Sequence, residues 1–203
     1  MYYCKGVARG NKMRYVLASG SPRRKELLRK VIEDYEILIP EGEEVTDSKE
    51  PEKVVMELSF KKASEIFHKI LTEDVVVIGA DTVVSYNQKV LGKPSDKDDA
   101  RRMIGELSGN THQVYTGVTL FFRKDGKEGH ISFCEETNVD VVKMTDDEID
   151  AYVKTNEPDD KAGAYGVQGL FARYIGGIKG DFYNVVGLPV ARLYAEMKRK
   201  DLL

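Results

Sequence analysis

The chain has 203 residues, with 31 lysines and arginines against 34 aspartates and glutamates, and a formal net charge of −3. This length suits one domain of ordinary size, or two lobes that share a sheet. The near balance of charge gives no general support for binding to nucleic acid or to an anionic membrane surface. No apolar run approaches the ~20 residues that a membrane-spanning helix requires.

The first twelve residues are polar and basic, and they lack the long apolar core of a secretory signal peptide. We interpret residues 1–12 as a loosely ordered extension that precedes a single domain over 13–203. The two cysteines, Cys4 and Cys134, are too few for a disulfide framework and lack the spacing of a metal site. Reduced thiols in the cytoplasm are the simplest interpretation.

A strand that runs directly into a helix is predicted next. The apolar residues at 15–18 favour a strand, and a Ser-Gly-Ser turn follows them. Pro22 stands at the first helical position, with Ser21 as the N-cap. The unsatisfied N–H groups and positive dipole of such a helix end favour an anion. The basic residues at 23–25 oppose that dipole, so either a phosphate chain lies beside them or the stretch is a solvated basic helix start.

The middle of the chain alternates between helix and strand signals. The apolar run at 75–78 suits a strand that is buried on both faces. Ser95 with Asp98 resembles a capping box at a helix start. In chain order, the predicted elements are a strand at 35–40, an acidic turn at 41–44, a helix at 51–71, a strand at 74–86, a helix at 96–107, and antiparallel strands at 113–123 and 130–143 joined by a turn at 124–127.

The C-terminal part of the chain adds two further helices. Thr145 with Glu148 forms a capping box for the first of them, which ends at about residue 155. A glycine-rich loop follows at 161–169, then a β-prone segment at 174–186, and a last helix at 189–200. Helices interleave with strands early, and a hairpin lies in the middle. This order favours a mixed α/β sheet over a purely doubly wound one.

Asp81 is a carboxylate between two apolar runs of a predicted strand. Its burial is costly unless it meets a cation or a metal ion, so it either takes part in function or caps a neighbouring turn. Other chemically capable residues accumulate at turns and strand ends. They are the cations Arg23, Arg24, Lys62 and Lys93, the carboxylate Glu43, and the polar residues Ser19, Thr82 and Gln168.

Cations and carboxylates beside a helix N-terminus suit the cleavage of a phosphoanhydride. The cations neutralise phosphates, carboxylates hold a divalent metal such as Mg²⁺, and one carboxylate can accept a proton from the attacking water. The chain lacks the GxxxxGK[ST] pattern of a P-loop, lacks GxGxxG after its first strand, and lacks GxSxG. A P-loop ATPase, a dinucleotide dehydrogenase and a nucleophile-elbow hydrolase are therefore not expected.

Long, collinear motifs occur at 17–28, 79–84, 91–94, 107–109, 160–169 and 180–189. Together these segments resemble the Maf family of nucleoside triphosphate pyrophosphatases. The resemblance runs from residue 15 to about residue 193. It implies a two-lobed, Maf/ITPase-like α/β fold, in which helices flank an elongated, twisted mixed sheet and the nucleotide lies in a central cleft. It also implies hydrolysis of a nucleoside triphosphate to the monophosphate and pyrophosphate.

The resemblance also implies roles for residues of this chain. Asp81 corresponds to the proposed proton acceptor, and Glu43 and Asp81 to positions linked to a divalent metal cation, expected to be Mg²⁺. The residues alone do not separate a base from a metal ligand at Asp81. Positions linked to substrate choice are Arg23, Thr82 and Gln168, and positions near the phosphates are Ser19, Arg24, Lys62 and Lys93.

Residues 161–169 look like the branch of the family that acts on dTTP and UTP, rather than the branch that acts on 7-methyl-GTP. Gln168 both donates and accepts hydrogen bonds, so it could recognise a pyrimidine edge. Phe171 and the pair Gly176 and Gly177 depart from the family pattern, which affects the expected shape of the base pocket.

We therefore expect a cytoplasmic, Mg²⁺-dependent pyrophosphatase of dTTP and UTP. Its partner is the nucleoside triphosphate substrate, with no nucleic acid and no membrane, and a homodimer is what the family implies. One alternative is a pyrophosphatase for modified or purine nucleotides. The other is a nucleotide-binding regulator of septum formation or growth, which would bind in the same pocket without turnover.

Overall fold

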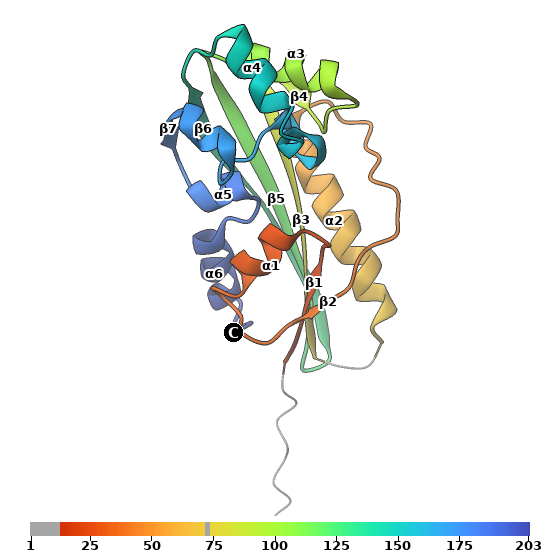
Figure 1. The fold of residues 1–203 in the computed structure, drawn as a ribbon. Helices are drawn as coiled ribbons and strands as arrows, with labels where there is room; N and C mark the ends of the chain where they lie inside the picture. The colour runs from red at the N-terminus through yellow and green to blue at the C-terminus, as the bar shows by residue number, and fades with distance from the viewer. Residues whose placement is uncertain (1–12, 72–73) are drawn as a thin grey trace, which may run out of the picture.

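The computed structural model describes residues 13–71 and 74–203, so the predicted extension at 1–12, with Cys4, lies outside the described residues. In the described part, a seven-stranded mixed sheet has the order β2-β1-β3-β5-β6-β7, with β4 paired to β3. The long strands β3 (Val75–Tyr86), β5 (Thr111–Lys124) and β6 (Lys127–Val141) give the molecule its elongated shape (Figure 1). This is the mixed α/β architecture that the sequence predicts.

The shorter strands are β1 (Arg14–Ala18), β2 (Glu36–Ile37), β4 (Lys89–Leu91) and β7 (Ile175–Lys179). The α-helices are α1 (Pro22–Leu28), α2 (Pro51–Lys69), α3 (Lys97–Leu107), α4 (Asp146–Val153), α5 (Phe182–Val186) and α6 (Val190–Arg199). The 3-10 turns are η1 (Glu157–Asp160), η2 (Ala162–Ala164) and η3 (Leu170–Tyr174). Within the described residues, no helix combines the length and the apolar character needed to cross a membrane.

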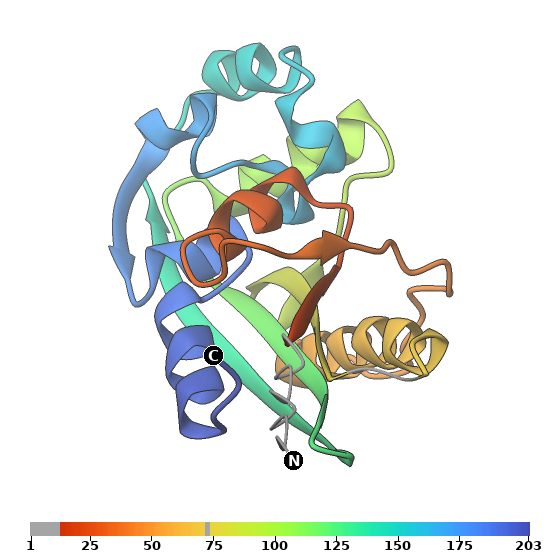
Figure 2. The same ribbon diagram turned by 90° about the horizontal axis from the view of Figure 1, so that it is seen from below.

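Different helices cover the two faces of the sheet. α2 packs on one face, and Figure 2 shows α6 on the opposite side. The side chains of β3 alternate accordingly: Val75 and Val77 belong to the core under α2, whereas Val76 and Ile78 belong to the larger core on the other face. This double burial explains the unbroken apolar run in the sequence.

One edge of β3 changes its partner along the strand. β1 pairs in parallel with residues 75–79, and β4 pairs in antiparallel fashion with residues 84–86. Between them, at 80–83, no described strand pairs with this edge. Two lobes meet at this opening: the lower lobe, with β1, β2, α1 and α6, and the upper lobe, with α3, α4 and the 3-10 turns (Figure 1). The structure thereby has the two-lobed form that the family resemblance implies.

Two glycines let α2 approach the sheet closely. A Cβ atom on Gly79 would lie 2.5 Å from the carbonyl oxygen of Ser59, and one on Gly117 would lie 2.3 Å from the carbonyl oxygen of Val55. Both contacts are with helix backbone, which cannot move aside as the end of a flexible side chain can. The absence of side chains at these two positions therefore sets the distance from α2 to β3, which contains Gly79, and to β5, which contains Gly117, and with it the position of Lys62.

The predicted strand, turn and helix at the N-terminal end are confirmed, with Ser21 as the N-cap of α1, and so is the capping box of Thr145 with Glu148. The predicted cap of α3 is wrong by one residue. Asp96 is the N-cap, because its carboxylate accepts a hydrogen bond from the N–H of Asp99 at 2.8 Å.

The β-prone segment at 174–186 is a strand only in its first part. β7 ends at Lys179, and Gly180 follows with a φ of +130° that favours glycine. Asp181 then caps α5, since its carboxylate accepts the N–H of Tyr183 at 2.7 Å. The short strand β4 was not predicted. The other differences are in element ends: the strand predicted at 35–40 is reduced to β2, α2 ends at Lys69, α6 begins at Val190, and the hairpin strands run over 111–124 and 127–141.

Gly79→Ala is expected to destabilise the protein, because the new Cβ would overlap the backbone of α2. Overpacking of this kind costs about 1–3 kcal/mol. Urea unfolding would measure the loss. Gly105→Ala in α3 is the matched control, since nothing lies within 4 Å of its Cβ position, and Ala is favoured over Gly inside a helix by roughly 0.5–1 kcal/mol. An unchanged free energy of unfolding in Gly79→Ala would contradict the close packing of α2.

Candidate active site

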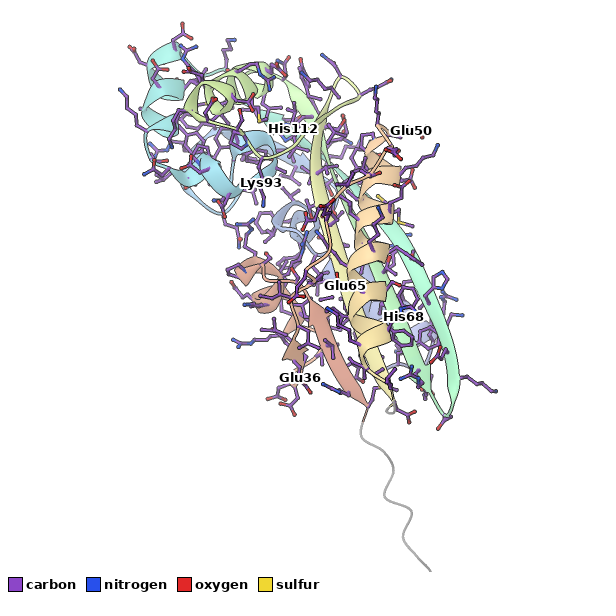
Figure 3. All side chains as sticks on the ribbon, turned by 90° about the vertical axis from the view of Figure 1, so that its right-hand side faces the viewer. Glu36, Glu50, Glu65, His68, Lys93 and His112 are labelled. Atoms are coloured by element: carbon purple, nitrogen blue, oxygen red, sulfur yellow. The ribbon has the colours of Figure 1, made fainter. Side chains whose placement is uncertain are left out.

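A cavity of about 590 Å³ opens where the edge of β3 is free. Both lobes contribute to it, and Figure 3 shows Lys93 on the upper lobe and Glu65 on α2. Gln168 is exposed and is not among the residues that line the cavity, so the structure does not bring it together with the other predicted residues. The sequence-predicted residues that do line the cavity are Ser19, Arg23, Arg24, Glu43, Lys62, Asp81, Thr82 and Lys93.

An ion pair links α2 to β3 inside this cavity. Lys62 Nζ donates to Asp81 Oδ1 at 2.6 Å, and the two side chains are only 13% and 10% exposed. A cation thus compensates the burial of the Asp81 carboxylate in an apolar strand. The carboxylate pairs with Lys62 instead of capping a neighbouring turn. The same Lys62 ammonium lies 3.0 Å from Oε1 of Glu44.

The acidic turn before α2 is attached to that helix through Glu65. Its carboxylate accepts the N–H groups of Glu41 and Gly42, each at 3.0 Å. The N–H of Glu41, together with Lys69 and the N–H of Gly42, lowers the pKa of Glu65 to about 2. Glu65 therefore carries a negative charge at neutral pH and holds the turn against the helix.

Glu44 makes the ion pair with Lys62, and its neighbour Glu43, which the resemblance links to a metal, lines the same cavity. Burial opposes ionisation of Glu44, but Lys62, with Lys93 and Arg24 nearby, outweighs it and holds the pKa of Glu44 below its ordinary value. The sequence does not distinguish two neighbouring glutamates in one turn. The ion pair of Glu44 with Lys62 of α2 distinguishes them in the structure.

Arg24 is held at the cavity by three neutral oxygen acceptors. Its Nε donates to the carbonyl oxygen of Gly187 at 2.9 Å, and one terminal nitrogen donates to Thr82 Oγ1 at 3.0 Å. The other terminal nitrogen lies 3.5 Å from Ser19 Oγ. Burial lowers the pKa of the Arg24 guanidinium, and the Asp81 carboxylate opposes that shift. The cation is thus fixed in place before any substrate arrives.

The turn between β1 and α1 is shaped by its own serines. Ser19 Oγ accepts the N–H of Ser21 at 3.2 Å, and Ser21 Oγ accepts the N–H of Arg24 at 3.5 Å. The first turn of α1 contains no acidic residue, and Arg23 is half-buried and lines the cavity. The basic start of this helix therefore faces the cavity instead of being fully solvated.

Asp81 and Thr82 point to opposite faces of β3, as successive residues of a strand must. Asp81 meets Lys62 under α2, whereas Thr82 meets Arg24 and, at 2.9 Å, the fully buried Thr116 on the other face. Both nevertheless line the same cavity. They can do so because the edge of the strand is open between β1 and β4.

The upper side of the cavity is formed by residues 161–167, which we call the cavity wall. Lys161, Tyr165 and Val167 line the cavity, and sequence reasoning assigned them no role. The Tyr165 hydroxyl forms a 2.8 Å hydrogen bond with Nε2 of His112. Burial lowers the pKa of His112 to about 4, so a neutral imidazole holds this tyrosine at physiological pH.

The charges that surround the cavity suit a phosphorylated substrate. Carboxylate oxygens are ligands that hard divalent cations prefer, and Mg²⁺ often completes its shell with substrate phosphates. Within the described residues, no three His, Cys, Asp or Glu side chains form a cluster that could hold a metal ion alone. The cations that line the cavity are Arg23, Arg24, Lys61, Lys62, Lys93 and Lys161, and the carboxylates are Glu43, Glu44, Glu65, Asp81 and Asp160.

The fold and the cavity define an α/β protein whose central cleft is equipped to bind a polyanion. The family model described as "Maf-like protein" matches residues 14–200. The chain therefore belongs to the Maf family, as its motifs predict.

Bacterial relatives match nearly the full length of the chain, and each is named dTTP/UTP pyrophosphatase. The protein of Agathobacter rectalis is 51% identical over 196 residues, covering 91% of this chain and 96% of its own length. The protein of Lachnoclostridium phytofermentans is 48% identical, covering 91% and 93%. The protein of Bacillus cereus is 46% identical, covering 92% and 95%.

Among solved structures, the Staphylococcus aureus Ham1 protein matches with a TM-score of 0.49 and 12% identity, covering 93% of this chain and 100% of that one. A likeness of this size adds nothing to the assignment.

Lys62→Met is expected to destabilise the protein by about 3 kcal/mol, because it leaves the Asp81 carboxylate buried without its cation. The double variant Lys62→Met/Asp81→Asn should recover much of the loss, since no buried carboxylate is then left without its cation and the Glu44 side chain is mostly exposed. Urea unfolding of both single variants and the double variant gives the coupling energy. The exposed pair Glu50–Lys53 serves as the control and should show little coupling. Equal coupling in the two pairs would contradict the buried character of the Lys62–Asp81 pair.

Proposed function

We propose that this chain hydrolyses dTTP and UTP to the nucleoside monophosphate and pyrophosphate. The observation that carries the proposal is the buried Asp81 carboxylate, paired with Lys62 in a cavity that cations from both lobes surround. The relatives named dTTP/UTP pyrophosphatase, at 46–51% identity over nearly the whole chain, support the same assignment.

In the proposed reaction, a water oxygen attacks the α-phosphorus, and the bond from that phosphorus to the oxygen bridging the β-phosphorus breaks. Pyrophosphate leaves with the bridging oxygen, and a proton of the water passes to a carboxylate. We assign this role to Oδ2 of Asp81, because Lys62 occupies Oδ1. Arg23, Arg24 and Lys93 neutralise charge that develops on the phosphates, which is usually the largest catalytic term.

We further propose that Asp81 and the acidic turn hold a divalent cation, with Mg²⁺ as the expected ion. Glu44 and Asp81 contact the same Lys62 ammonium, so their oxygens share one part of the cavity. The predicted ligand Glu43 lines that cavity as well. Substrate phosphate oxygens would complete the ligand set. When bound, the cation would supply further neutralisation of phosphate charge.

The assignments of Arg23, Thr82 and Gln168 to substrate choice stay predictions. Thr82 is already engaged by Arg24, and Gln168 would have to reach a base from the rim of the cavity. The cytoplasmic location and the homodimer stay predictions as well. The two alternatives would use the same cavity. One is a pyrophosphatase that prefers purine or modified nucleotides, and the other is a regulator that binds a nucleotide without turnover.

Pyrophosphate release from a panel of canonical and modified nucleoside triphosphates, with Mg²⁺ and with EDTA, tests the proposal. We expect release that requires the cation and is fastest with dTTP and UTP. Fastest release from a purine or modified nucleotide would contradict the proposed substrates. Binding without release from any nucleotide would favour the regulatory alternative, and release in EDTA would contradict the metal requirement.

Asp81→Asn is expected to lower kcat by about 10²–10⁴-fold, because the amide cannot accept the proton from water. Circular dichroism should show that the variant stays folded. Asp125→Asn is the matched control: it removes one carboxylate at an exposed hairpin turn with a φ of +49°, which asparagine also adopts. Turnover of Asp81→Asn at the rate of the control would remove Asp81 from the mechanism.

A further inference from the structure

The cavity wall at 161–167 is built almost without regular secondary structure. Apart from the short turn η2, its backbone is not held in a helix or in a strand ladder of the described residues. Its position must therefore come from other contacts. Inside the wall, the N–H of Gly163 donates to the carbonyl oxygen of Gly92, and the Tyr165 hydroxyl bonds to His112. At the two ends of the wall, the contacts involve Glu157, a half-buried residue of η1 that does not line the cavity.

The carboxylate of Glu157 holds the segment that follows the wall. Oε2 accepts the N–H of Leu170 at 2.8 Å, and Oε1 accepts the N–H of Phe171 at 3.4 Å and the hydroxyl of Tyr152 at 3.0 Å. The backbone at Gly169 packs closely against this carboxylate, since a Cβ on Gly169 would lie 2.3 Å from Oε2. Burial, followed by the Glu157 charge, raises the pKa of Tyr152, so its hydroxyl keeps the proton that it donates.

The backbone of Glu157 holds the start of the wall. Its carbonyl oxygen accepts a hydrogen bond from Lys161 Nζ at 2.7 Å, and the same ammonium contacts Oδ1 of Asp160 at 2.6 Å. A Cβ on Gly166 would lie 2.9 Å from Lys161 Cε and 3.5 Å from Oε1 of Glu157. Glu157 therefore holds the first residue of the wall, Lys161, and also the segment that directly follows the wall.

The wall lies on the side of the cavity that suits a nucleobase. Tyr165 and Val167 present apolar surface there, and Val84 and Val114 line the cavity with them. The wall's charged residue, Lys161, is already paired with Asp160, whereas the cations Arg24 and Lys62 come from α1 and α2. A flat base would lie against the apolar side chains of Tyr165 and Val167, and the phosphates would lie against Arg24 and Lys62.

We propose that Glu157 is a positioning residue for nucleobase recognition, acting through the cavity wall and through Gln168, which lies between Gly166 and Gly169. This proposal rests on the proposed function. A carboxylate suits the role because it accepts three donors and presents none of its own. A glutamine would direct an N–H toward one of these donors and leave it unsatisfied.

Glu157→Gln tests the proposal, with Asp159→Asn as the matched control. Asp159 is on the same turn and pairs with Lys97 at an exposed site, without contact to the wall. We expect the KM for dTTP and UTP to rise about tenfold, which is the order of magnitude for the loss of one hydrogen bond to a charged acceptor. The preference for dTTP over dCTP, as a ratio of kcat/KM values, should fall while kcat changes little. Inhibition by pyrophosphate should stay as in the wild type, because the phosphate side is untouched.

An equal loss of kcat/KM for every nucleotide, with the dTTP preference kept, would overturn the proposal and indicate a purely structural role. If Glu157→Gln does not fold, Gly169→Ala takes its place, because its Cβ displaces the chain from an intact Glu157. The same loss of preference is then expected. If the wild type hydrolyses no nucleotide, the proposed function fails by itself. The positioning role is then judged from the ratio of Kd values for dTTP and dCTP, and a ratio unchanged in the variant would overturn it.

Discussion

The site depends on one stretch of β3, at 80–83, which pairs with β5 on one edge and with no strand of the described residues on the other. β1 leaves this edge at Ala18, and β4 joins it only at Val84. Because the edge is open, Asp81 and Thr82 reach the same cavity from opposite faces of the sheet. Ligand sites in α/β sheets commonly form where neighbouring chain segments leave a sheet in different directions. The change of pairing partner along one strand is thus the feature that opens the cleft and exposes Asp81 and Thr82 to it.

The cations of the cavity are held in two different ways. Lys62 and Lys161 are paired with carboxylates, Asp81 and Asp160 among them. Within the described residues, Arg24 has neutral oxygens as hydrogen-bond acceptors in place of a carboxylate. Its charge is therefore directed at whatever enters the cavity, and partial burial strengthens that interaction because the local dielectric is low. Lys62 has the other task of stabilising a carboxylate in an apolar strand. The cations of this cavity are therefore not interchangeable.

Short-range patterns account for what the sequence predicts well. The Ser21 cap and the capping box of Thr145 are decided by side chains within a few residues of the helix start, so they can be seen locally. The contact of Glu44 with Lys62 joins a turn to a helix, and no local rule separates Glu44 from its neighbour. Gly79 is an intermediate case. A glycine inside an apolar strand signals close backbone approach, although the sequence does not say which helix approaches.

On the assignments that we propose, the residues that select the base and the carboxylate that takes part in the reaction lie on different elements. The cavity wall belongs to the upper lobe, where the N–H of Gly163 donates to the carbonyl oxygen of Gly92 at 3.0 Å. β3, β5 and β6 pass through both lobes without a break, so continuous strands set the distance from the wall to Asp81. Residues 168–170, which directly follow the wall, are exposed. The N–H of Leu170 in this loop donates to the carboxylate of Glu157. Changes in that loop can therefore alter which base fits without moving the carboxylate that we assign to the reaction.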